Sequence, residues 1–145
     1  LQIYVLPELV ETRNALKQVV ADSKADGYWK RFQDEINTRK RMAFFLGHIN
    51  MTVCESILGS MHKLGSHDGP LLARSVGTLR YLRIGIPLIE QSTSDESVAG
   101  YKTIVNSFDP IILDLTTVID AGTRAVKAAK LPSGNVQISS TPAAR

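Results

Sequence analysis

The sequence has one cysteine, few aromatic residues and no apolar run long enough to cross a membrane. A single thiol, Cys54, excludes a disulfide within the chain and leaves the redox state of its compartment open. A transmembrane helix needs about 20 consecutive apolar residues, whereas Arg, Asn, Asp or Pro interrupts every apolar segment here. Aromatic residues make up 6% of the chain and strand-favouring runs are missing, so we do not expect a β-sandwich.

The first residues show no secretory or transit peptide. Residues 1–6 are mostly apolar, but the stretch is too short and lacks a basic leader. A precursor could have been trimmed before this point, so the compartment is not decided. The charge of +3 and pI near 9.1 are mildly basic. Nucleic-acid binders concentrate far more charge on one face, so this excess fits an acidic protein surface better.

What the chain does contain is helical periodicity. Its 145 residues suit one domain. Apolar residues recur every three or four positions in four segments, at about 7–24, 28–63, 70–89 and 93–130. We therefore predict an all-α fold: an up-and-down antiparallel four-helix bundle over residues 1–130, followed by an extended or flexible tail at 131–145.

Local signals predict where these helices begin and bend. Pro7 suits the first turn of the first helix, and Asp26 is the expected cap of the second. Thr93 to Glu96 read as a capping box for the fourth. We expect Pro87 to kink or loosen the third helix, and Pro110 to kink the fourth without dividing it.

Each helix carries an apolar stripe that should face the core. The stripe of the second helix contains two polar positions, Arg39 and Asn50, which could fix register or form a ligand-binding notch. The predicted stripes are Leu6, Leu9, Val10, Leu16, Val19 and Val20; Trp29, Phe32, Ile36, Ala43, Leu46, Val53 and Ile57; Leu72, Val76, Leu79, Ile86 and Ile89; and Val98, Tyr101, Val105, Phe108, Ile112, Leu115, Ile119 and Val126, with a gap at Gly122.

No set of residues has the spacing of a catalytic or metal centre. His48, His62 and His67 lack the cysteines or paired carboxylates that would complete a zinc site. The Glu-x-x-His motifs of di-iron bundles are missing. Cys54 follows the seam residue Val53 and should pack as a small apolar group. We therefore expect no enzymatic activity, no metal and no cofactor.

Basic residues cluster on the second and third predicted helices. Such runs are either solvated faces or docking surfaces for an acidic partner. The candidate partner-docking residues are Lys30, Arg31, Arg39, Lys40, Arg41, Arg80 and Arg83.

Two stretches resemble a known family. The first is Trp29-x-x-Phe32-Gln33-Asp34-Glu35-Ile36-x-x-Arg39, and the second is Ser97-Val98-Ala99-Gly100-Tyr101-x-x-Ile104-Val105. They resemble the conserved segments of the PsbQ family, the extrinsic four-helix-bundle subunits of photosystem II in the thylakoid lumen. The Pro-rich N-terminal arm of plant members is missing, so the chain looks more like the algal PsbQ-prime relatives.

The resemblance implies a non-catalytic role in photosynthesis. Such subunits dock on the lumenal face of photosystem II in the chloroplast, together with the core and other extrinsic subunits. They stabilise the oxygen-evolving centre by retaining calcium and chloride. The protein would then be peripheral to the thylakoid membrane, with Trp29 and Ile36 serving the fold and the basic residues serving contact.

The sequence is also compatible with two other hypotheses about function. One is a periplasmic four-helix ligand-binding domain of a bacterial chemoreceptor or kinase, whose ends would join membrane helices. The other is a lumenal subunit of the chloroplast NADH dehydrogenase-like complex, which shares the PsbQ fold. A bipartite transit peptide or flanking membrane spans in the precursor would separate the sensor from the lumenal subunits.

Overall fold

The computed structural model describes residues 2–49 and 68–134. Within these ranges the protein is mostly helical and contains no strand, which confirms the all-α prediction. No helix in the described ranges is both long and apolar enough to span a bilayer. Some predictions concern residues outside the described ranges: Asn50, Val53, Cys54, Ile57, His62, His67 and the tail beyond Gly134.

Helix α1 spans Gln2–Ser23, and it begins earlier than predicted. Pro7 therefore lies inside the helix instead of in its first turn. An interior proline cannot donate to the carbonyl four residues earlier and crowds that carbonyl, so the turn before Pro7 is expected to be the weakest part of α1. Leu9, Leu16 and Val19 form the buried face of α1, as the predicted stripe required.

The second predicted helix is divided into α2 (Tyr28–Asp34) and α3 (Ile36–Leu46). Glu35 between them has extended backbone angles, φ −121° and ψ 118°. The break turns Ile36 outward, so that this predicted core residue is 48% exposed. Met42 is buried while Ala43 is only half-buried, so the seam passes through Met42. The prediction of one unbroken helix through this region was wrong.

The start of α2 also differs from the expectation. The N-cap is Gly27 in the left-handed region, at φ 70°, and no side chain caps the helix. Glycine suits this position because other residues are strained there. Asp26 contributes its main-chain carbonyl instead, which accepts a 2.7 Å hydrogen bond from Nη1 of Arg31.

Helix α5 (Asp68–Gly85) continues directly into the 3-10 helix η2 (Ile86–Gln91). Pro87 lies in the first turn of η2, which confirms that this proline loosens the end of the helix. The side chains of Leu72, Val76, Leu79 and Ile89 are fully buried, as predicted.

The fourth predicted helix is divided into α6 (Asp95–Asn106) and α7 (Phe108–Gly134). Pro110 in the first turn of α7 cannot donate a backbone hydrogen bond to Asn106, which explains the division at Ser107. The cap of α6 is Ser94, whose Oγ accepts from the Ser97 amide at 3.1 Å, and not Thr93. The seam keeps its phase across the division, since Val105 and Phe108 are both buried.

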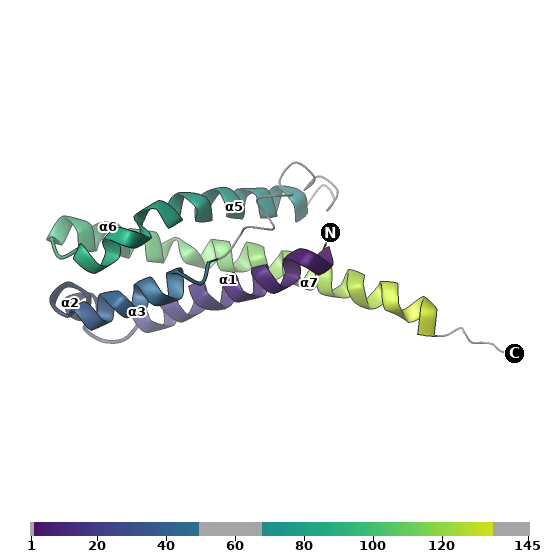
Figure 1. The fold of residues 1–145 in the computed structure, drawn as a ribbon, viewed down its shortest axis with the longest axis horizontal. Helices are drawn as coiled ribbons and strands as arrows, with labels where there is room; N and C mark the ends of the chain where they lie inside the picture. Colours follow the sequence, from purple (N-terminus) through teal and green to yellow (C-terminus); the bar gives the residue numbers. More distant parts are fainter. Residues whose placement is uncertain (1, 50–67, 135–145) are drawn as a thin grey trace, which may run out of the picture.

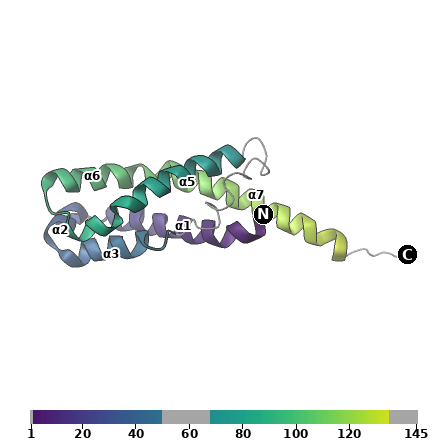
Figure 2. The ribbon, with the colours of Figure 1, turned by 45° about the horizontal axis from the view of Figure 1, so that its top comes forward.

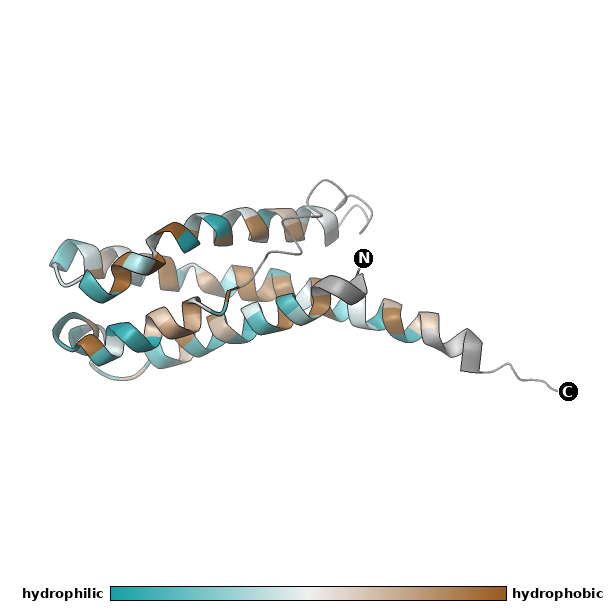
Figure 3. Cartoon of the chain, in the orientation of Figure 1, coloured by the Kyte–Doolittle hydropathy of each residue, from teal (hydrophilic) through white to brown (hydrophobic). Residues whose placement is uncertain are grey.

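Helix α7 is the longest helix of the described residues and contributes to the core along much of its length. It packs against α1 and α5, while α3 packs against α1 and η2. Chain colours show that α1 and α7 run in opposite directions (Figure 1), and a second view shows the same neighbours (Figure 2). Hydrophobic residues recur along the helices (Figure 3). The gap that the sequence leaves at Gly122 is filled from α1, since an added Cβ there would lie 2.9 Å from Leu6 Cδ2.

The C-terminal part of α7 projects beyond the N-terminal end of α1 (Figures 1 and 2). The helix continues to Gly134, past the predicted limit at residue 130. Toward this end of α7, Arg124, Lys127, Ala128 and Ala129 are all exposed.

Tyr28 is expected to lose its proton late. Its ring lies 5.0 Å from Trp29 and 6.3 Å from Phe32, centroid to centroid. Burial, and secondly the carboxylate of Asp22, raises the pKa of Tyr28 from 10.0 to about 12. Between these values the folded state holds a proton that the unfolded chain has lost. The free energy of unfolding should therefore fall as pH rises from about 10 to about 12.

The measurement is phenolate absorbance against pH, combined with urea unfolding at both ends of this window. In the Tyr28→Phe variant the late absorbance step should vanish, and the loss of stability across the window should shrink. If the Tyr28→Phe variant kept the absorbance change near pH 12, the environment described for Tyr28 would be wrong.

Candidate docking surface

The seven predicted docking residues occupy different environments. Arg39 is 6% exposed, and its guanidinium lies inside the fold. Its Nη1 donates to the carbonyls of Phe32 at 2.8 Å and Gln33 at 2.9 Å, and its Nε donates to the carbonyl of Glu90 at 2.9 Å. Arg39 therefore has no side-chain surface to offer a partner, and we remove it from the docking set.

The environment of Arg39 follows from the break at Glu35. Helix α2 ends at Asp34, which leaves carbonyl groups of its last turn without helical partners. The guanidinium bonds to two of them at the negative end of the helix dipole. Its third bond reaches η2, far away in the sequence. One buried cation thus joins α2, α3 and η2, and we call this arrangement the Arg39 clasp.

Three further basic residues of this region are engaged locally. Lys30 forms an exposed ion pair with Asp34 at 3.0 Å. Arg31 bonds to the carbonyl of Asp26. Arg41 pairs with Asp22 at 2.6 Å and lies over the ring of Phe45, 4.8 Å from its centroid. These contacts fix the side chains beside the α1–α2 turn.

Lys40, Arg80 and Arg83 are exposed. The ion pairs within the described ranges are formed by Lys30, Arg41 and Arg74, so neither Lys40 nor Arg80 takes part in one. Lys40 and Arg80 are therefore the members of the set best placed to meet a partner.

The residues that carry the family resemblance build one corner of the fold. Phe32 is fully buried, and its ring lies 5.3 Å from Trp29 and 5.8 Å from Tyr101. Gln33 donates to the carbonyl of Thr93 at 2.9 Å and to Oδ1 of Asp95 at 2.6 Å. With the Arg39 clasp, these contacts tie α2 to the start of α6 and to η2. The sequence allowed two interpretations of Arg39, a polar stripe residue that fixes register or a docking residue, and these contacts support the structural one.

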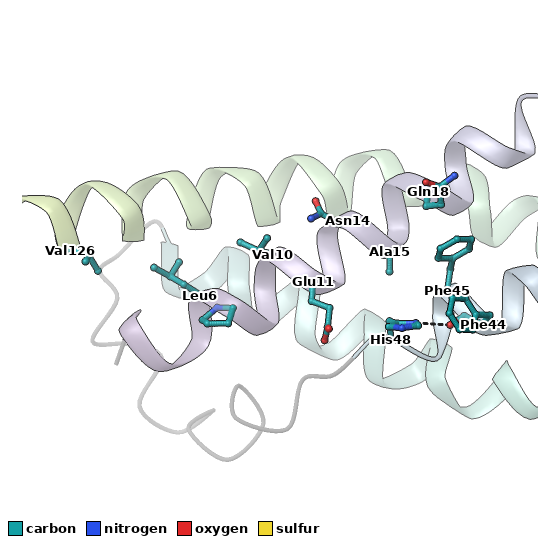
Figure 4. A pocket seen from close by; sticks show the side chains of 11 residues that line it. Leu6, Val10, Glu11, Asn14, Ala15, Gln18, Phe44, Phe45, His48 and Val126 are labelled. Carbon is teal, nitrogen blue, oxygen red and sulfur yellow. Dashed lines mark hydrogen bonds between the residues drawn. The ribbon is translucent and has the colours of Figure 1, made fainter.

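An apolar groove opens near the other end of α1. Its volume is about 930 Å³. Among the described residues that line it, Glu11, Asn14, Gln18 and His48 are polar, and the His48 ring packs against Phe44 at 4.6 Å. The groove's apolar lining comes from α1, the end of α3 and α7 (Figure 4): Leu6, Val10, Ala15, Phe44, Phe45 and Val126.

Within the described residues, no cluster of three or more His, Cys, Asp or Glu side chains could hold a metal ion. No protein-family model, curated protein or solved structure was found to match the chain.

Proposed function

We propose that the protein is a non-catalytic extrinsic subunit of photosystem II, docked on the lumenal face of the complex in the chloroplast thylakoid. It would stabilise the oxygen-evolving centre by helping to retain calcium and chloride. The observation that supports this most is the corner built by Phe32, Gln33 and Arg39. These residues carry the family resemblance, and each of them makes contacts that hold the helices together. Structural residues of this kind are what a non-enzymatic family would share.

The finer architecture belongs to the same proposal. We infer an up-and-down four-helix bundle in which α2 with α3, α5 with η2, and α6 with α7 each form one interrupted rod beside α1. The interruptions have local causes at Glu35, Pro87 and Pro110. They leave the order and contacts of the rods compatible with such a bundle.

Docking is proposed to be electrostatic at long range. Lys40 and Arg80 are exposed cations, and exposed charges act mainly on the rate of association. The partner surface on the photosystem would therefore be acidic, and the protein would be held peripherally.

Salt and charge reversal should weaken the docking. The Debye length shrinks to ~3 Å at about 1 M salt, so the protein should leave washed thylakoid membranes without detergent. A Lys40→Glu/Arg80→Glu variant should rebind to salt-stripped membranes more slowly at low ionic strength. Its melting temperature should stay close to that of the parent, because exposed charges contribute only ~0–1 kcal/mol to folding. The assay is rebinding measured against ionic strength.

Lys24→Glu is the matched control, since it makes the same kind of change at an exposed lysine outside the docking set. Rebinding of the double variant at the parental rate would show that these cations are only solvated. Failure of the parent to rebind to photosystem II membranes would contradict the proposed function itself.

The apolar groove favours a second candidate, a four-helix ligand-binding domain of a periplasmic sensor. Sites for small ligands are concave, mostly apolar and lined by a few polar groups. Phe44, Phe45 and Val10 supply such a lining, with Asn14 and Gln18 as polar groups. The sequences that flank this chain in its precursor separate the two candidates, because a sensor would be joined to membrane spans.

A further inference from the structure

The outward face of α5 and η2 carries three large hydrophobic side chains that face solvent. Tyr81 is 82% exposed, Ile84 is 75% exposed and Leu88 is 59% exposed. Spacings of three and four residues place these side chains on one side of the element. The opposite side carries Leu79, Leu82 and Ile89, which are buried in the core. We call the exposed residues Tyr81, Ile84 and Leu88 the outer stripe.

Arginines outnumber acidic residues along the element that carries the outer stripe, which has Asp68 at its start and Glu90 near its end. Between Asp68 and Glu90 the sequence contains three charged residues, Arg74, Arg80 and Arg83, and all are basic. Arg74 is paired with Asp114 of α7 at 2.5 Å. Arg80 and Arg83 directly precede Tyr81 and Ile84 of the stripe in the sequence. Both arginines are exposed. A partner that covers the stripe therefore meets arginines at its edge.

The backbone beneath the outer stripe is held at three points. The carbonyl of Gly85 accepts a 3.1 Å hydrogen bond from the Tyr101 hydroxyl of α6. Ser92 Oγ donates to the carbonyl of Leu88 at 2.7 Å, and the Arg39 clasp holds the carbonyl of Glu90. A surface fixed before binding loses less conformational entropy when a partner docks.

We propose that the outer stripe is a docking surface for an acidic amphipathic helix of a partner protein. The stripe extends over about two helical turns, which matches the i, i+3 or i+4, i+7 anchors of a partner helix. Tyr81 supplies the aromatic anchor that protein interfaces favour. Acidic residues beside the partner's apolar face would meet Arg80 and Arg83. The proposal deepens the docking role proposed above, and rests on it for the claim that a partner exists.

The probe is a synthetic helical peptide with leucine at i, i+3, i+4 and i+7 and glutamate on both flanks. A second peptide carries lysine in place of glutamate. Binding is measured by fluorescence anisotropy of the labelled peptides. The parent protein should bind the acidic peptide at least about tenfold more tightly than the basic peptide. A Tyr81→Ser/Ile84→Ser variant should bind the acidic peptide about tenfold more weakly than the parent does, because the variant lacks two interface anchors.

Leu113→Ser is the matched control, because Leu113 is 66% exposed on a different helix, α7, and does not belong to the stripe. This variant should bind the acidic peptide like the parent. Circular dichroism and melting curves show whether each variant remains folded. No binding of the acidic peptide, equal binding of both peptides, or an equal loss in Leu113→Ser would overturn the proposal.

Two further arms identify other occupants. Binding to anionic phosphatidylglycerol vesicles without peptide binding, lost in the double variant, would assign the stripe to a lipid surface and overturn the proposal. Self-association that the double variant abolishes in analytical ultracentrifugation would assign it to a second copy. Normal rebinding of the double variant to thylakoid membranes would overturn a docking role for the stripe there and leave the proposed function standing. If the parent bound the acidic peptide but did not rebind to thylakoid membranes, the docking role of the stripe would stand and the proposed function would be contradicted.

Discussion

Replacing Arg39 by alanine is expected to lower the free energy of unfolding by about 3 kcal/mol or more. Each hydrogen bond to a charged group contributes about 1.5–3 kcal/mol, and buried acceptors left without a partner add their own cost. The substitution removes the three hydrogen bonds of the Arg39 clasp. The carbonyls of Phe32, Gln33 and Glu90 then lose the donor that Arg39 supplies. The melting temperature should fall by about 10 °C for a chain of this size.

Urea unfolding followed by circular dichroism measures this effect. Arg39→Lys keeps the charge but cannot reach three carbonyls with one planar group, so we expect it to lie between the parent and Arg39→Ala. Lys40→Ala, at the exposed neighbouring position, should change stability by less than about 0.5 kcal/mol. Similar stability of Arg39→Ala and Lys40→Ala would show that the clasp does not hold α2, α3 and η2 together.

Replacing Phe32 by alanine is expected to cost about 3–5 kcal/mol, the range for removing a buried aromatic ring. The Phe32 side chain is fully buried and contacts the rings of Tyr28, Trp29 and Tyr101. Loss of the ring would leave a cavity at the corner where α2 meets α6. Because Trp29 is the single tryptophan, its emission reports on this corner directly.

The control is Phe44→Ala, which removes the same ring from a position that is 61% exposed. This change should cost much less than Phe32→Ala, since little apolar surface is returned to water. A shift of Trp29 emission is expected for Phe32→Ala alone. Equal costs at the two positions would mean that Phe32 does not anchor the core.

The helical elements could be predicted wherever the signal was periodic and local. Leu115 and Ile119 are buried as the heptad pattern required, and Pro87 loosens the end of α5 as expected. The break at Glu35 could not be predicted in this way. No glycine or proline lies near Glu35 in the sequence. The guanidinium of Arg39 donates hydrogen bonds to the carbonyls left free at the end of α2, and it also bonds to the carbonyl of Glu90. A contact across 51 residues leaves no local trace.

The candidate docking set was predicted less well than the fold. The sequence placed Arg39 in the docking set together with Lys40, and also in the apolar stripe, where it could fix register. The tertiary fold decides between these interpretations, because it supplies the carbonyls that draw Arg39 inside. The outer stripe did leave a signal that the sequence reasoning missed. Tyr81, Ile84 and Leu88 repeat with helical spacing, but out of phase with the core residues Leu79 and Ile89. A second apolar phase on one helix predicts an exposed apolar face, and such faces often mark interaction sites.

The sequence distributes its charge unevenly between the two ends of α7. Every acidic residue of the sequence lies at or before Asp120, whereas four basic residues, Arg124, Lys127, Lys130 and Arg145, follow it. The preceding part contains 13 basic and 14 acidic residues, so the net positive charge of the chain resides entirely after Asp120. In the field of a negatively charged surface such a molecule experiences a torque as well as an attraction. It is therefore expected to rotate during approach so that the free end of α7 arrives first.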